Sequence, residues 1–176
     1  LIQTNICYWQ TNPGVTNLIA TSCAAITDGR WHQVVVKRTG TTTDIFLDNV
    51  SQLPTTDTKN YNVTSAITMG SGATYGAHQM FLDDVRIYNK ALSTAEMAAL
   101  YTAGTTRPAT VNASAVKLTA GTSLATGLVG HWTFDGNNTT GSGGTGTARD
   151  SSTSNINGTL TNMSTTTPAR VQGRLG

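Results

Sequence analysis

The chain has 176 residues and a formal net charge of +2, and only 11% of its residues are charged. This length allows one domain with a real core, and 38% hydrophobic residues with so small a net charge argue against intrinsic disorder. Its 11 Lys and Arg residues are scattered, which disfavours nucleic-acid binding, and no apolar run approaches the roughly 18 residues of a membrane span. Abundant Thr, 18 Gly and a single Glu favour an all-β fold with many turns.

Two cysteines flank the first predicted turn, which is built on Asn12-Pro13-Gly14. If residues 1–9 and 17–24 pair antiparallel about this turn, residues whose numbers sum to about 30 face each other. Cys7 and Cys23 satisfy that sum, so we expect a cross-strand disulfide; the alternative is two buried free thiols. The bridge would indicate an oxidising, extracytoplasmic compartment.

A hairpin is predicted next, with strands at 31–38 and 45–50 and a Gly-containing turn between them. Further strands are expected at 66–70 and 80–88, separated by a loop over 70–76. Aromatic side chains in these alternating segments and in the later strand 128–134 are expected in the core, namely Trp31, Phe46, Phe81, Trp132 and Phe134.

One helix is predicted, over about 93–102. Ser93 as N-cap and Glu96 three residues later form a capping box, with Leu92 and Met97 as a hydrophobic staple. Gly104 is placed to cap the C-terminus.

The chain then reads as a Thr, Ala and Ser linker over 105–127. A strand follows at 128–134, then a Gly, Ser and Thr loop to Arg149, and a short strand at 156–160. Within the loop, Gly141 to Gly146 match a dinucleotide-binding glycine pattern. Because no helix is predicted after them, we interpret the match as accidental.

Two parts of the sequence resemble opposite ends of one domain type. Asp28-Gly29-Arg30-Trp31-His32-Gln33-Val34-Val35-Val36, with the later run from Phe81 to Ser93, resembles the second half of a laminin-G-like, concanavalin A-like jelly roll. The run Gly127 to Gly136, with 150–160 and 170–176, resembles the beginning of the same domain. The resemblance implies an antiparallel two-sheet β-sandwich whose end precedes its beginning.

The inverted order divides the chain into 1–104, the linker 105–127 and 128–176. Either the chain is cut from tandem repeats, with Leu1 in place of Met indicating a fragment or processed product, or it is a permuted or swapped unit. The apolar strands of 128–176 need partners, and 1–104 lacks the strands that normally cover it. We therefore expect Trp132 or Phe134 to contact the Val34–Val36 or Val85–Ile87 strand of the same chain.

Catalysis is disfavoured by the titratable residues. Glycoside hydrolysis needs a suitably spaced carboxylate pair, whereas the single Glu lies on a helix and Asp83 and Asp84 point to opposite faces of a strand. His32, His78 and His131 are isolated and are interpreted as packed or edge histidines. A hydrolase is kept only as a remote alternative.

Calcium is the cofactor to consider, because hard cations take carboxylate, amide and carbonyl oxygens in loops. Asp135, followed by Gly136-Asn137-Asn138, and Asp150, followed by hydroxyl residues, fit this chemistry. The resemblance implies a structural Ca²⁺ joining the first and last strands, which would bring Asp84 or Asp83 near Asp135.

The function expected is a non-catalytic, extracellular or cell-surface recognition and adhesion module that binds a glycan or a surface protein. Aromatics near predicted loops are the candidate ligand-binding residues: Tyr8, Trp9, Tyr61 and Tyr75. The alternative is a structural subunit of a fibre or surface array, self-associating through exchanged halves.

Overall fold

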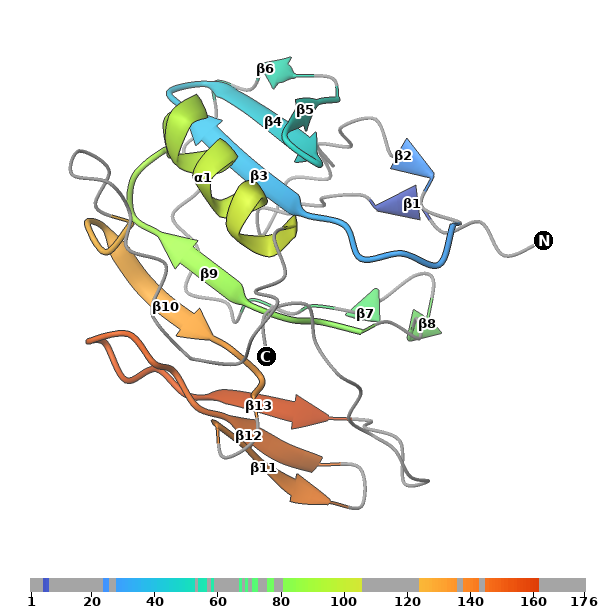
Figure 1. The fold of residues 1–176 in the computed structure, drawn as a ribbon, viewed down its shortest axis with the longest axis vertical. Helices are drawn as coiled ribbons and strands as arrows, with labels where there is room; N and C mark the ends of the chain where they lie inside the picture. The colour runs from blue at the N-terminus through green and yellow to red at the C-terminus, as the bar shows by residue number, and fades with distance from the viewer. Residues whose placement is uncertain are drawn as a thin grey trace. The chain divides into compact units, whose positions relative to one another are not determined.

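The computed structural model describes residues 5–6, 24–25, 28–52, 54–56, 58, 67, 69, 71–72, 76–77, 81–105, 124–135, 138–142 and 145–161. In this part of the chain every strand pair is antiparallel and the one helix is α1 (Thr94–Thr105), so the predicted all-β class is confirmed (Figure 1). The described helix has 12 residues, too few to cross a membrane.

The chain forms two compact units. The first comprises Leu1–Ala66 and Ala91–Thr102, and the second comprises Ile67–Lys90 and Ala103–Gly176. Each unit therefore combines segments that are distant in the sequence.

A four-stranded sheet forms the best-defined part of the first unit. It contains β3 (Val34–Thr39), β4 (Thr42–Leu47), β5 (Val50–Ser51) and β6 (Thr55–Thr56), with β4 pairing all three others. The predicted hairpin is thus confirmed, but the turn expected at 39–44 is shorter.

The turn between β3 and β4 contains only two residues. Thr39 pairs with Thr42, leaving Gly40 and Thr41 between the strands, and Gly40 has the φ of 59° that such a turn favours. The Thr-rich sequence therefore continues as strand, in keeping with the β preference of Thr.

The burial of this sheet is uneven. Ile45 and Thr43 on β4 are 2% and 1% exposed, whereas Val34, Val36 and Val50 on the flanking strands are exposed. The Lys37 ammonium lies 5.2 Å from the centre of the Phe46 ring, which allows a cation–π contact. The core is therefore centred on β4.

The N-terminus of α1 has the predicted capping box. The Ser93 hydroxyl accepts a hydrogen bond from the Glu96 backbone N–H at 3.2 Å, and the Ser93 backbone N–H donates to Glu96 Oε2 at 2.8 Å. Leu92 and Met97, the predicted staple residues, are both buried. Gly104, expected to end the helix, lies within it, because α1 continues to Thr105.

Two short strands near the N-terminus, β1 (Asn5–Ile6) and β2 (Ala24–Ala25), pair in the predicted register. Asn5 faces Ala25 and Ile6 faces Ala24, so each pair of numbers sums to 30. Cys7 and Cys23 lie outside the described residues, and their disulfide remains a prediction.

The second unit pairs two segments that the resemblance assigns to opposite ends of the domain type. β10 (Leu128–Trp132) pairs with β9 (Val85–Tyr88), and Trp132 is the partner of Val85 (Figure 1). The contact expected between these segments is therefore formed within one chain. Leu128 faces Tyr88 and Gly130 faces Ile87, which leaves Val129 as an extra residue and indicates a β-bulge.

The strand expected over 80–88 begins only at Val85. Asp84 has a φ of 51°, a left-handed conformation that a strand cannot contain, and it forms a bend before β9. The expected strand 66–70 is also wrong at its described positions, since Ile67 is irregular and Met69 lies in a bend. In place of the loop expected next, β7 (Ser71–Gly72) pairs with β8 (Gly76–Ala77).

A three-stranded sheet completes the second unit. It contains β11 (Thr139–Ser142), β12 (Thr145–Ala148) and β13 (Gly158–Thr161), in the order β11-β12-β13. The loop predicted up to Arg149 is thus a hairpin, because alternating Thr residues supply strand-forming side chains despite the intervening Gly residues. The last strand starts two residues later than predicted.

Two of the predicted core aromatics are exposed. Trp31 is 38% exposed and Phe81 is 66% exposed, because each lies in irregular chain before a strand instead of within it. Phe46, Trp132 and Phe134 are half-buried.

The predicted disulfide can be tested by thiol titration of the denatured, unreduced protein. Directly opposed positions in an antiparallel pair bring Cβ atoms to about 4.5–5.5 Å, close to the distance that a disulfide spans. We therefore expect no titratable thiol before reduction and two after it. Two free thiols before reduction would contradict the disulfide, and with it one argument for an extracytoplasmic location.

Candidate functional site

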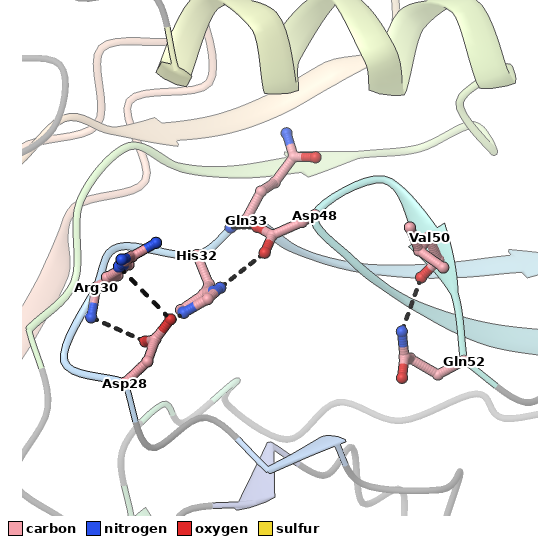
Figure 2. Close-up of polar contacts among 7 residues, drawn as sticks. All are labelled: Asp28, Arg30, His32, Gln33, Asp48, Val50 and Gln52. Carbon is pink, nitrogen blue, oxygen red and sulfur yellow. Dashed lines mark hydrogen bonds and ion pairs between the residues drawn. The ribbon is translucent and has the colours of Figure 1, made fainter.

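Asp28, His32 and Asp48 form a hydrogen-bonded cluster in the first unit, which we call the His32 clamp (Figure 2). His32 Nδ1 lies 2.7 Å from Asp48 Oδ2, and His32 Nε2 lies 2.9 Å from Asp28 Oδ1. Ionised carboxylates only accept hydrogen bonds, and a histidine donates from both ring nitrogens only when it is protonated. The geometry of the clamp therefore fits an imidazolium between two carboxylates.

Local turn chemistry places the two carboxylates. Asp28 accepts a hydrogen bond from the Arg30 backbone N–H at 3.0 Å, and Gly29 between them has a φ of 71°. Asp48 and Asn49 form the two-residue turn from β4 to β5 with φ values of 50° and 64°, which Asp and Asn tolerate better than other side chains.

Asp48 also extends the pairing of β3 with β4. Its backbone N–H donates to the Gln33 carbonyl at 2.9 Å, and its Oδ1 accepts from the Gln33 backbone N–H at 3.0 Å. Asp48 thus binds both the ring of His32 and the backbone of Gln33.

The electrostatics of the clamp favour its charged form. Hydrogen bonds to Asp28 and then to Asp48 raise the pKa of His32 above its ordinary 6.5. The hydrogen bond from His32, followed by the one from the Arg30 backbone, lowers the pKa of Asp28 below its ordinary 3.8. The largest cause of both shifts is the same side-chain hydrogen bond between His32 and Asp28, and the attraction of opposite charges adds to it.

The loop that precedes His32 carries one cationic and one aromatic side chain that are exposed. The Arg30 side chain is 82% exposed, and Trp31 presents part of its indole to solvent. The His32 side chain is only 17% exposed, so the ring is beneath the surface and supports the loop. We call residues 28–31 the recognition loop. Its indole, guanidinium and carboxylate can stack on a ligand and hydrogen-bond to it.

The predicted metal residues lie in the second unit, where Asp84 contacts the His131 ring and Asp150 accepts a hydrogen bond from the His131 backbone N–H. Asp84 Oδ1 lies 2.6 Å from His131 Nε2 and 3.0 Å from both Arg86 Nε and Arg86 Nη2. Asp83 is half-buried, and Asp135 is exposed. Within the described ranges, no three His, Cys, Asp or Glu residues are grouped so that they could hold a metal ion.

Asp150 is 3% exposed and has its oxygens engaged by the protein. Oδ1 accepts from the backbone N–H groups of His131 and Ser152, both at 2.8 Å. Oδ2 accepts from the Ile156 backbone N–H and the Ser152 hydroxyl, also both at 2.8 Å. A carboxylate has about four acceptor sites, so Asp150 has none left for a cation.

The electrostatics of Asp150 reflect these hydrogen bonds. Burial opposes ionisation of its carboxyl, but the backbone N–H groups of His131, Ser152 and Ile156 outweigh burial and lower the pKa from 3.8 to about 2. Asp150 is therefore a structural carboxylate that holds the loop between β12 and β13 to β10.

The four predicted ligand-binding aromatics, Tyr8, Trp9, Tyr61 and Tyr75, lie outside the described residues. The His32 clamp was not predicted from the sequence, where His32 was interpreted as a packed or edge residue. Two features of the sequence could have revealed the clamp. Asp28 and His32 are four residues apart, and a two-residue turn between β3 and β4 places Asp48 opposite Gln33, next to His32.

Residues 3–98 match the family model of the Concanavalin A-like lectin/glucanases superfamily, of laminin-G type. The match spans more than half of the chain, so the chain belongs to this superfamily. The predicted laminin-G-like family is thereby confirmed.

A solved structure with similarity to the chain is the crystal structure of an S-layer domain-containing protein from Clostridium thermocellum. The two share 22% sequence identity with a TM-score of 0.40, over 48% of this chain and 45% of that chain. The chain thus spans less than half the length of that structure. No curated protein matches the chain.

The role of Asp150 can be tested with Asp150→Ala, compared with Asp135→Ala as an exposed control in the same unit. Asp150→Ala leaves three partly buried backbone N–H groups without their acceptor, and hydrogen bonds to a charged group contribute about 1.5–3 kcal/mol, so we expect a loss of at least ~2 kcal/mol. The control should change stability by no more than about 0.5 kcal/mol. Denaturant unfolding in chelator, which removes any metal effect, measures both.

The same variant predicts a pH dependence. Because folding lowers the pKa of Asp150, its ionised carboxylate stabilises the folded state fully above pH 3.8. This stabilisation is lost as the pH falls towards 2. Wild type should therefore lose more stability than Asp150→Ala over this interval. Parallel pH profiles would contradict the assignment.

Calcium binding remains a prediction, and the described geometry offers no ready site for it. A structural Ca²⁺ at Asp135 would stabilise the folded state by mass action, so chelation should lower the melting temperature of the calcium-saturated protein. Asp135→Ala should abolish the difference. An unchanged melting temperature in excess chelator would refute the site.

Proposed function

We propose that the chain is a non-catalytic recognition module of an extracellular or cell-surface protein, binding a glycan or a surface protein through the recognition loop. The observation that supports this most directly is the exposed pair Arg30 and Trp31 on a loop fixed from below by the His32 clamp, in a chain of the concanavalin A-like lectin/glucanase superfamily.

The chemistry of the carboxylates supports binding over hydrolysis. Glycosidases use two carboxyl groups about 5–10 Å apart, one of which needs a raised pKa to act as an acid. The single Glu of the chain, Glu96, caps α1, and the pKa of Asp28 is lowered, not raised. Both ring nitrogens of His32 face carboxylates, so the ring has no nitrogen free to act as a base.

The recognition loop offers the groups that sugars need. An indole stacks on the apolar face of a pyranose ring, while carboxylate and guanidinium groups hydrogen-bond to hydroxyls. The Asp28 and Arg30 side chains are 46% and 82% exposed, and they lie on the same loop as Trp31. A glycan is therefore the ligand class to test first.

The test compares Trp31→Ala with Phe81→Ala, an exposed aromatic outside the loop, on a glycan array followed by calorimetry. Loss of one stacking contact, about 1–2 kcal/mol, should weaken binding roughly tenfold in Trp31→Ala and leave it unchanged in Phe81→Ala. Equal binding by both variants would exclude the loop as the site. Released reducing ends would indicate a hydrolase, and concentration-dependent polymers without glycan binding would favour the assembly function.

A further inference from the structure

We infer that His32, in its protonated form, is a positioning residue that locks the recognition loop onto the turn between β4 and β5, so that the loop is released when the ring loses its proton as the pH rises. The inference rests on the proposed function only in that the same loop carries Arg30 and Trp31.

The geometry of the ring requires a proton on both nitrogens. A neutral imidazole has one N–H and one lone pair, so one of the two carboxylates would face a lone pair at 2.7 or 2.9 Å. Two acceptors at this separation repel each other. Deprotonation must therefore break one side of the clamp.

The charges around the ring also favour a protonated His32. Asp28 from the recognition loop and Asp48 from the β4–β5 turn face its two nitrogens, and Arg30 Nε lies 4.0 Å from Asp28 Oδ2. With an imidazolium these four groups are neutral in sum. Without it they carry one net negative charge even with Arg30 counted, and Arg30, being largely exposed, offsets the charge of Asp28 only weakly.

The side that opens is the Asp28 side. Asp48 keeps two hydrogen bonds with the Gln33 backbone that do not involve the ring. Asp28, in contrast, contacts Arg30 within the same loop, and its hydrogen bond to His32 ties the loop to the ring that Asp48 holds, just before β3. Loss of that bond frees residues 28–31 without unfolding the hairpin.

The direction of the pH effect follows from the two pKa shifts. His32 has a pKa raised above 6.5, so its contribution is complete below 6.5 and is lost as the pH rises through the raised value. Asp28 has a pKa lowered below 3.8, so its contribution is lost only as the pH falls through that lowered value. The loop is locked between these limits.

The first experiment follows the wild-type chain by NMR from pH 5 to 9. The His32 ring resonances should titrate above 6.5, and the mobility of the Arg30 and Trp31 backbone on the ps–ns timescale should rise with the same midpoint. Amide protection within the β3–β4 ladder should stay constant. A His32 titration at or below 6.5, or loop mobility that does not follow it, would overturn the inference.

The second experiment uses His32→Gln, which donates from one nitrogen and does not titrate, with His131→Gln as the matched control. In His32→Gln the loop should be mobile at every pH, whereas the control should keep the wild-type profile. A pH-dependent loop in His32→Gln would overturn the inference, and if that variant fails to fold the wild-type titration decides alone.

The NMR experiments need no ligand. The pH-dependent clamp and the proposed glycan-binding function can therefore be rejected independently of each other. A loop that locks with pH but binds no glycan would reject the proposed function and leave the clamp intact. Glycan binding that is independent of pH, on a loop whose mobility does not change, would reject the clamp and leave the function intact.

Discussion

Carboxylate oxygens that accept hydrogen bonds from backbone N–H groups hold the irregular parts of this protein in place. Asp150 accepts from three backbone N–H groups, Glu96 from that of Ser93, and Asp48 from that of Gln33. In a chain with only 9 acidic residues, these three satisfy backbone N–H groups in loops and next to a helix end that the strand ladders do not satisfy. These three carboxylates therefore have a structural role.

The carboxylates of Asp48 and Asp150 represent two chemical forms of this arrangement. In the first, His32 brings a positive charge to two carboxylates, and the result is a charge-assisted clamp beneath an exposed loop. In the second, Asp150 meets neutral donors, and the result is a buried anchor with a lowered pKa. The first arrangement responds to the protonation of a histidine near neutral pH, whereas the second is constant until strong acid.

The sequence predicted features that depend on a few neighbouring residues. The capping box of Ser93 and Glu96, the β3–β4 hairpin and the pairing sum of 30 near the N-terminus are all local patterns, and the structure has them. The contact between β9 and β10 was accessible because the resemblance left the apolar strands of 128–176 without partners and 1–104 without the strands that normally cover it. The hairpin of β11 and β12 was missed because its Gly content resembles that of a loop.

The candidate site could not be predicted in the same way. Its residues come from a bend and from a turn 16 positions further on, and they meet only if the intervening turn contains two residues. The turn predicted from the sequence, at 39–44, has six residues instead of two, which shifts the pairing register by two residues and hides the cluster. The left-handed φ of Asp84 was likewise not predictable, and it shortens the strand that the sequence analysis expected over 80–88.

The pairing of Leu128 with Tyr88 has a consequence for how the chain reaches its folded state. The two-residue turn lets β3 and β4 meet on the microsecond timescale of a hairpin, whereas β10 can reach β9 only after a much longer stretch of chain has closed on itself. Contacts between residues so distant in the sequence slow folding. We therefore expect β9 to remain unpaired with β10 for some time after the first sheet has formed. During this time a strand from another molecule can pair with β9 in place of β10.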